Sequence, residues 1–237
     1  MAGEEHLISL DESEHPWSLL LEVARATPPD SWVLVGGLMV HVHALRAGVN
    51  ASRPTRDIDL ALNISAVGIG LVAGPLQRLG FRPIDAKPVH RFTRGDDVVD
   101  IMVGKRYSVR WATKPVLAAE GAQQAIDRRD WYVLRTAAGD ACIGVPDPLA
   151  AIVAKAAAYQ VDQRDRDRHL EDLAVLLASS GGRRRLGLER LTSNDKRRLR
   201  HVAQYLGDEG HAAWMVLDEP DRVIAQRAFA AVADQLG

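Results

Sequence analysis

The strongest constraint on the fold is a short apolar run that meets two glycines. Residues 32–35 (Trp-Val-Leu-Val) are followed directly by Gly36 and Gly37, which predicts a buried strand ending in a turn. Residues 38–47 then have the pattern of a helix that ends at Gly48. Backbone N–H groups at such a helix start favour a bound anion such as a triphosphate, so this segment predicts an α/β unit with an anion site.

Three acidic residues follow this segment in a pattern that is typical of a metal site. Asp57 and Asp59 lie two residues apart on a predicted strand over residues 57–62, so their side chains share one face of it. Asp100 lies within an apolar strand predicted over residues 98–103, where an acid is costly unless it is paired or binds a metal. Neighbouring carboxylates repel each other, and a divalent cation such as Mg²⁺ offsets that cost.

The remaining pattern divides the chain into two parts. Residues 1–145 predict an α+β domain with a small mixed sheet flanked by helices, and residues 146–237 predict an all-helical domain that begins after the Pro146-Asp147-Pro148 break. Further elements are expected as helices over residues 17–26, 67–79, 148–159, 166–179 and 220–236, and as strands over residues 89–92 and 131–135. A further helix, capped by Ser193 or Asn194, is expected to end at Leu206.

Composition excludes several classes of protein. The 237 residues are 47% hydrophobic and 26% charged, which is ordinary for a globular chain. A single cysteine, Cys142, excludes an internal disulfide framework and a cysteine-based zinc cage, and fits a reducing cytosol. The acidic N-terminal segment is no secretory signal, and no stretch approaches the ~20 apolar residues of a membrane span. We therefore expect a cytoplasmic protein with no membrane partner.

The net charge of −1 conceals an alternation of basic and acidic blocks. Residues 31–110 carry eleven Lys or Arg and six Asp, and residues 181–205 carry eight Lys or Arg and two acids. Acidic blocks at both ends of the chain cancel this excess. The basic blocks are typical either of solvated helix faces or of a surface that binds phosphate groups of a nucleic acid.

Two sequence segments resemble a known enzyme superfamily. They are Val35-Gly-Gly-Leu-Met-Val-His41 and Arg53-Pro-Thr55-Arg-Asp57-Ile-Asp59-Leu, with Asp100 on a later strand. This arrangement resembles the nucleotidyltransferase superfamily of DNA polymerase beta type. It is closest to the AbiEii/MenT-like toxin nucleotidyltransferases, over about residues 32–178. Lys155 and the stretch that ends at Asp172-Leu173 occupy places comparable to a Lys and an Asp-Leu of that branch.

The resemblance implies an enzyme that transfers a nucleotide from an NTP with Mg²⁺, with two ions possible. In the toxin branch the acceptor is the 3′ end of tRNA, and an antitoxin restrains the enzyme. The implied metal ligands are Asp57, Asp59 and Asp100, with Asp100 alternatively acting as base. The implied catalytic set adds Lys155 and Asp172, and the implied nucleotide-binding set is Gly36, Gly37, Arg53 and Thr55.

Other interpretations of the same residues stay open. Asp57 and Asp59 alone are also typical of a solvated loop pair, and Arg53 or Lys155 of surface cations. A small-molecule nucleotidyltransferase of the aminoglycoside-modifying kind shares the glycine and Asp-x-Asp core, but would present an acidic pocket to a polycationic acceptor. A third possibility is a catalytically silent nucleotidyltransferase fold that serves as a binding partner.

Overall fold

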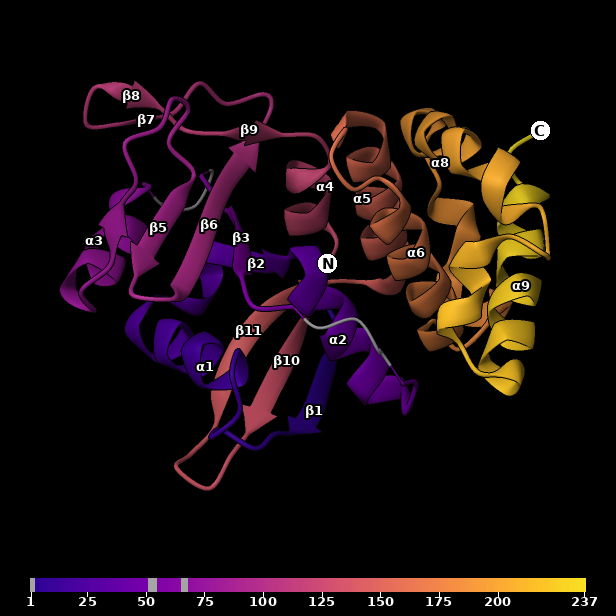
Figure 1. Ribbon diagram of the computed structural model, residues 1–237, viewed down its shortest axis with the longest axis horizontal. Helices are drawn as coiled ribbons and strands as arrows, with labels where there is room; N and C mark the ends of the chain where they lie inside the picture. Colours follow the sequence, from indigo (N-terminus) through magenta and orange to yellow (C-terminus); the bar gives the residue numbers. More distant parts are fainter. Residues whose placement is uncertain (1–2, 51–54, 65–67) are drawn as a thin grey trace. The chain divides into compact units, whose positions relative to one another are not determined.

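The computed structural model describes residues 3–50, 55–64 and 68–237. The chain forms two compact units, Met1–Met39 with Thr55–Asp147 and Val40–Pro54 with Pro148–Gly237. Residues 40–50 cluster with the second unit, and the predicted division into domains at 145/146 stays a prediction. The first unit combines sheets and helices and the second is helical, as Figure 1 shows. The predicted α+β class is confirmed.

The first unit is built on two sheets and a small hairpin (Figure 1). The larger sheet has the strand order β2-β3-β6-β5-β4, with β9 paired to β6, and its strands are β2 (Trp32–Val35), β3 (Ile58–Leu62), β4 (Arg82–Pro83), β5 (Arg91–Arg94), β6 (Asp97–Gly104) and β9 (Ala118–Ala119). The smaller sheet consists of β1 (Glu5–Ser9), β10 (Arg129–Arg135) and β11 (Ala141–Pro146). The hairpin is formed by β7 (Arg110–Trp111) and β8 (Lys114–Pro115).

In the described part of the chain, four α-helices accompany these sheets, although the residues of α2 are divided between the two units. They are α1 (Trp17–Ala26), α2 (Gly36–Ala47), α3 (Gly70–Arg78) and α4 (Ala122–Asp127), with a 3-10 turn at Pro29–Ser31. The prediction for α1 and β2 matches the structure residue for residue, because each has an apolar pattern bounded by proline or glycine. Strands β1 and β11 and helix α4 were not predicted.

The two faces of the larger sheet differ in character. On one face, Ile58, Leu60 and Ile101 are fully buried. On the other face, Val33, Val35 and Ala61 pack with helix α4 in an apolar cluster. Helix α4 is only six residues long, so it covers part of this face. Strand alternation places Asp59 on the same face as Ala61, beyond that cluster. Asp57 directly precedes β3, which begins one residue later than predicted.

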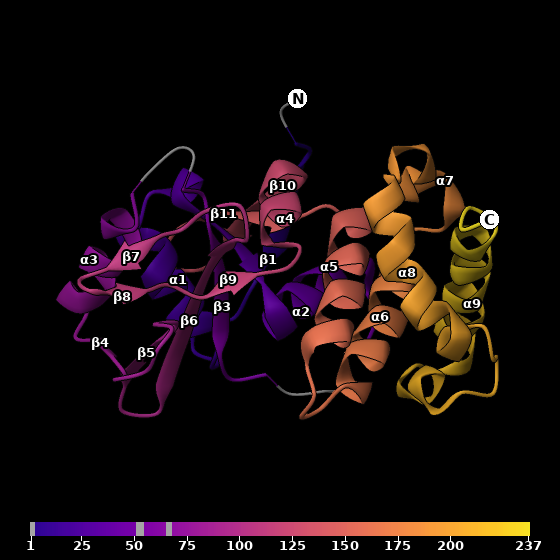
Figure 2. The ribbon, with the colours of Figure 1, turned by 90° about the horizontal axis from the view of Figure 1, so that it is seen from above.

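The second unit is a set of packed helices. They are α5 (Pro148–Val161), α6 (Asp167–Ser179), α7 (Arg183–Leu186), α8 (Ser193–Leu206) and α9 (Glu219–Ala233), with 3-10 turns at Leu188–Arg190 and Ala212–Val216. Helix α5 packs against α6 and α8, and α6 packs against α9, as can be followed in Figure 2. No helix in the described ranges has both the length and the apolar character needed to cross a membrane.

Helix α8 shows how local chemistry sets an element boundary. The Thr192 hydroxyl accepts a hydrogen bond from the Asp195 amide at 3.2 Å, and the Asp195 carboxylate accepts one from the Thr192 amide at 3.0 Å. This reciprocal capping box satisfies two N–H groups that the helix itself leaves unpaired. Ser193 or Asn194 was the predicted cap. That prediction was one or two residues too late, because only Thr192 precedes an acid by three positions.

Candidate active site

Strand register brings two of the predicted acids into one row across the larger sheet. Val35 pairs with Asp59 between β2 and β3, and Asp59 pairs with Asp100 between β3 and β6. Asp100 in turn pairs with Arg91 between β6 and β5. Directly paired residues on neighbouring strands point to the same face of a sheet, so Asp59, Asp100 and Arg91 lie side by side.

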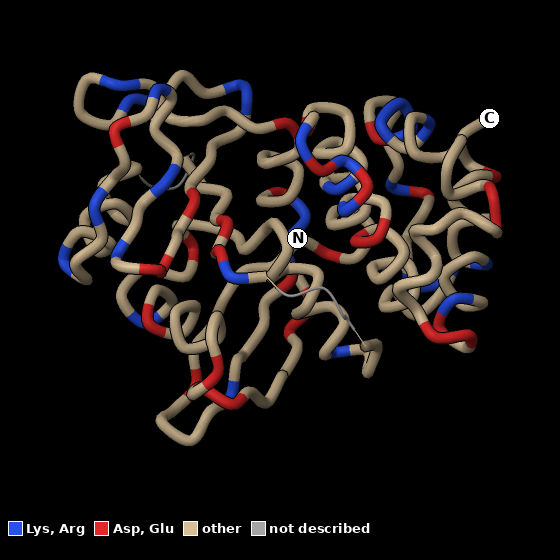
Figure 3. The backbone as a smooth tube through the Cα atoms, in the orientation of Figure 1, with Lys and Arg blue, Asp and Glu red and all other residues tan. Residues whose placement is uncertain are grey.

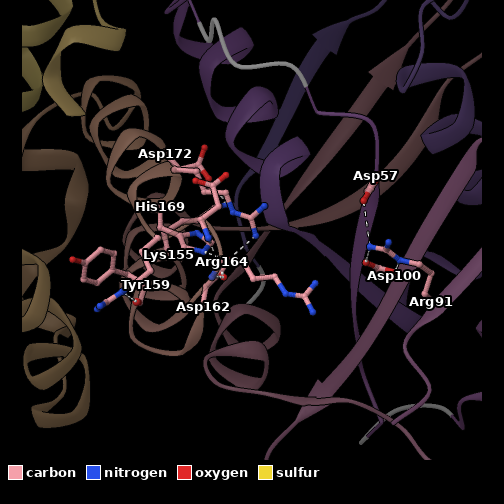
Figure 4. A network of polar contacts seen from close by, with 12 residues as sticks. Asp57, Arg91, Asp100, Lys155, Tyr159, Asp162, Arg164, His169 and Asp172 are labelled. Carbon is pink, nitrogen blue, oxygen red and sulfur yellow. Dashed lines mark hydrogen bonds and ion pairs between the residues drawn. The ribbon is translucent and has the colours of Figure 1, made fainter. Parts of the chain in front are cut away.

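Arg91 holds the acids together. Its Nε donates to Asp100 Oδ1 at 2.8 Å and its Nη2 donates to Asp100 Oδ2 at 2.7 Å, which is the bidentate geometry of a strong ion pair. The same Nη2 lies 3.4 Å from Asp57 Oδ2, as Figure 4 shows. The hydrogen bonds with Asp100 raise the pKa of Arg91, against the effect of burial, and the charges of Asp57 and Asp59 add to the rise. One guanidinium therefore interacts with three carboxylates and offsets only part of their negative charge.

Gly36 and Asp59 meet where β2 turns into α2. Gly36 has a φ of +71°, a conformation that side chains disfavour. A Cβ atom at this position would lie 1.8 Å from Asp59 Oδ2, so only glycine fits. The Asp59 carboxylate is thus placed at the start of α2, where the helix dipole favours negative charge. Gly37, the next residue of α2, is buried.

The acid cluster is accessible from solvent. The side chains of Asp57 and Arg91 are 43% and 37% exposed, whereas that of Asp100 is 13% exposed. Thr55 lies two residues before Asp57 and is half-buried. Arg53, predicted to contact the nucleotide, lies outside the described residues. The cluster has a buried base and an open side, which is the form that a substrate-binding site requires.

The helical unit brings Lys155 and Asp172 together. Lys155 on α5 donates to Asp172 Oδ2 on α6 at 2.5 Å (Figure 4), and the two residues are 5% and 4% exposed. Both residues were predicted to be catalytic, and the structure makes them each other's partner in a buried ion pair. Such a pair ties α5 to α6, because removing one member leaves the other charge buried without compensation.

Asp162 anchors a second polar group in this unit. It accepts hydrogen bonds from His169 Nε2 at 3.1 Å and Arg168 Nη2 at 2.8 Å. Burial and the charge of Lys155 lower the pKa of His169 to about 4, so the imidazole is neutral at pH 7. Burial raises the pKa of Asp162, but the Arg164 amide, His169 and the charge of Arg168 outweigh it and lower that pKa to about 2.

Comparison with known proteins gives one structural match. No protein-family profile matches this chain. No curated protein sequence matches it either. A crystal structure described as an antigenic nucleotidyltransferase-like protein from Paracoccidioides brasiliensis superposes with a TM-score of 0.50 at 13% identity, over 89% of this chain and 91% of that chain. The chain has a nucleotidyltransferase-like fold. This finding supports the fold expected from the two sequence segments and does not extend to the AbiEii/MenT-like branch.

Within this nucleotidyltransferase-like fold, the donor set of the acid cluster fits Mg²⁺. Carboxylate oxygens are the ligands that Mg²⁺ prefers, and Asp57, Asp59 and Asp100 all act electrostatically on one cationic side chain. Across the described residues, no three or more His, Cys, Asp or Glu side chains are arranged so that they could hold a metal ion. The cation among these carboxylates is Arg91, and the metal role of the three acids stays a prediction.

Sequence reasoning missed Arg91. The strand over residues 89–92 was predicted, but no local feature marks its arginine as different from other surface cations. The usable signal is the turn that follows. Arg94 pairs with Asp97 across the two residues Gly95 and Asp96, and counting outward from that pair places Arg91 opposite Asp100.

Proposed function

We propose that this protein is a Mg²⁺-dependent nucleotidyltransferase that transfers a nucleoside monophosphate from an NTP to RNA, with the 3′ end of tRNA as acceptor. The observation that carries the proposal is the row formed by Asp59, Asp100 and Arg91 next to the Gly36 turn, with Asp57 completing the cluster. Three carboxylates that all interact with one arginine, in a nucleotidyltransferase-like fold, suit a metal-bound triphosphate.

Different residues of the first unit would bind the metal and the nucleotide. Asp57, Asp59 and Asp100 would hold Mg²⁺, as one ion or two. Bound Mg²⁺ supplies positive charge that stabilises the oxygens of the triphosphate during transfer. The backbone N–H groups of Gly36 and Gly37 lie at the start of α2, where phosphate oxygens are favoured. Thr55 and Arg53 are assigned as further nucleotide contacts from the resemblance.

The transfer itself exchanges one bond to phosphorus for another. The acceptor hydroxyl oxygen forms a bond to the α-phosphorus, and the bond from that phosphorus to the bridging oxygen of the β-phosphate breaks. Pyrophosphate leaves with the electron pair of that bond. The acceptor hydroxyl gives up its proton, and Asp100 would take it in the alternative in which this carboxylate acts as base instead of holding the metal. Because the reaction creates little new charge on the protein, positioning and neutralisation account for most of its rate.

The choice of RNA as acceptor rests on the basic surface of the helical unit. Arg183, Arg184 and Arg185 on α7 are exposed, and Arg197 on α8 is exposed as well. Figure 3 shows these helices among the Lys- and Arg-bearing parts of the chain. Clustered cations release counterions from a phosphate backbone when they bind it, which favours a polyanionic acceptor over a polycationic one. On the basis of the resemblance, we assign Lys155 and Asp172 to the same catalytic activity. The resemblance also leads us to propose a cognate antitoxin as the partner that restrains the enzyme.

The decisive experiment is a transfer assay. The protein is incubated with Mg²⁺ and each α-³²P-labelled NTP, with total tRNA or with a panel of aminoglycosides, beside an Asp59→Asn variant of equal folded content. We expect label on tRNA that is lost in the variant. Label on an aminoglycoside alone would replace RNA by a small-molecule acceptor. The absence of transfer to either acceptor, together with no binding of NTP, would overturn the enzymatic proposal.

A further inference from the structure

One nitrogen of Arg91 contacts two of the acids that would hold the cation. Its Nη2 lies 2.7 Å from Asp100 Oδ2 and 3.4 Å from Asp57 Oδ2. Mg²⁺ binds carboxylate oxygens at about 2.0–2.1 Å. An ion that coordinated Asp57 and Asp100 together would therefore lie between these oxygens, where Nη2 now lies. The guanidinium and such an ion exclude each other.

Arg91 cannot yield this place by losing its proton. An arginine remains charged at any pH that a protein tolerates, and the surrounding acids raise its pKa further. The side chain must therefore move. The backbone of Arg91 is held in β5. Its side chain can move because it is 37% exposed to solvent. Both hydrogen bonds to Asp100 break in that movement, which opposes cation binding.

The displaced Arg91 guanidinium would lie close to the phosphate groups of a bound NTP. The planar fork of an arginine binds two oxygens of a phosphate as it binds two oxygens of a carboxylate. An NTP that arrives with Mg²⁺ presents phosphate oxygens next to the carboxylates that hold the metal. Arg91 would thus leave one anion for another of similar geometry, and its bidentate hydrogen bonding would be restored.

We propose that Arg91 exchanges partners when the substrate binds: it holds Asp100 and Asp57 in the unliganded protein, and it binds the triphosphate once Mg²⁺ takes the carboxylates. This inference rests on the proposed function and adds a residue to its nucleotide-binding set. It predicts that the affinities for the cation and for the nucleotide change in opposite directions. Loss of Arg91 strengthens the binding of the cation alone and weakens the binding of the nucleotide, whereas a purely structural residue would shift both in one direction.

The test measures two affinities on the full chain by isothermal titration calorimetry. The first titrant is Mn²⁺ alone, which takes the same oxygen ligands as Mg²⁺. The second is an NTP analogue with a methylene between its α- and β-phosphates, in saturating Mg²⁺. For Arg91→Met we expect about tenfold tighter Mn²⁺ and about tenfold weaker analogue, because a charged hydrogen bond changes an equilibrium constant by about this factor.

Two further variants complete the test. Arg91→Lys keeps the charge without the fork, so we expect tighter Mn²⁺ and a smaller loss of analogue affinity than in Arg91→Met. Arg94→Met is the matched control on the same strand. Arg94 binds Glu22 at 2.6 Å and Asp97 at 2.9 Å, outside the acid cluster, so neither affinity should change.

The outcomes separate this inference from the proposed function. Unchanged affinities, or a shift of both in the same direction, in Arg91→Met and Arg91→Lys would overturn the partner exchange. Tighter Mn²⁺ with unchanged analogue affinity would overturn it too. If tRNA labelling still depends on Asp59 in those cases, the proposed function stands without this role for Arg91. If neither the wild type nor Arg91→Met binds Mn²⁺, the partner exchange is overturned, whereas the proposed function is overturned only by the loss of both NTP binding and transfer.

Discussion

Gly36 and Asp59 approach so closely that a methyl group on Gly36 would lie 1.8 Å from Asp59 Oδ2. The start of α2 and the second acid of the Asp-x-Asp pair are thus one structural unit. A change at the glycine is a change in the position of the carboxylate. The glycine is therefore required by the site as well as by the turn.

The first prediction concerns this contact. Gly36→Ala should lower the free energy of unfolding by more than the about 1–2 kcal/mol that a left-handed alanine costs, because Asp59 must also move. Gly48→Ala is the matched control. Gly48 has a φ of +70° but nothing within 4 Å of its Cβ position, so only the conformational cost applies. Denaturant unfolding of both variants measures the difference, and equal losses would contradict a tight contact at Gly36.

The second prediction concerns the acids of strand β6. Asp100→Asn should reduce the rate of nucleotide transfer about 10²-fold or more, as the loss of a group that stabilises the transition state does. Asp97→Asn provides a control on the same strand. Asp97 pairs with Arg94 at 2.9 Å, outside the acid cluster, so its removal should leave the transfer rate nearly unchanged. Similar losses in both variants would show that the effect is structural.

The third prediction concerns the buried pair Lys155–Asp172. Lys155→Met should lower the free energy of unfolding by about 3–5 kcal/mol, because the Asp172 charge is left buried without its partner. The double variant Lys155→Met/Asp172→Leu should recover most of that loss. Urea unfolding of the three proteins measures the coupling. A folded double variant that no longer transfers nucleotide would support the predicted catalytic role, and one with full activity would reduce the pair to a structural role.

The fourth prediction concerns pH. The pKa of His169 is about 4 in the folded chain and 6.5 in an unfolded one, so the unfolded chain binds the additional proton between these values. Stability should therefore fall as the pH drops from 6.5 to 4, by up to about 3 kcal/mol. His169→Gln, which keeps a donor toward Asp162, should flatten this part of the stability curve. The Asp162 contribution is lost at lower pH, as the pH falls from 3.8 through about 2.

The fifth prediction concerns the basic helix α7. If Arg183, Arg184 and Arg185 contact a single-stranded end of tRNA, replacing all three by Gln should reduce the slope of log K against log salt by ~2. Arg227→Gln on α9, in the acidic C-terminal block, should leave the slope unchanged. Fluorescence anisotropy of labelled tRNA at several salt concentrations measures both. An unchanged slope in the triple α7 variant would show that the RNA binds elsewhere on the protein.

Local patterns were sufficient for most of the individual elements. Helix α1 and strand β2 were predicted without error because proline, glycine and apolar spacing mark their ends. Strand β1 was missed because its residues, Glu5–Ser9, mix charged and apolar types and owe their strand conformation to pairing with β10. Strand β11 and helix α4 likewise depend on neighbours that are distant along the chain.

The candidate site divides in the same way. The sequence by itself determined which acids of the first unit are candidates, because the spacing of Asp57 and Asp59 and the apolar surroundings of Asp100 are local facts. Only the tertiary structure decided that Arg91 lies among these acids and that Lys155 pairs with Asp172. The physical reason is that register between strands and packing between helices join residues through contacts distant in sequence, so the partner of a charge is decided only when the chain has folded.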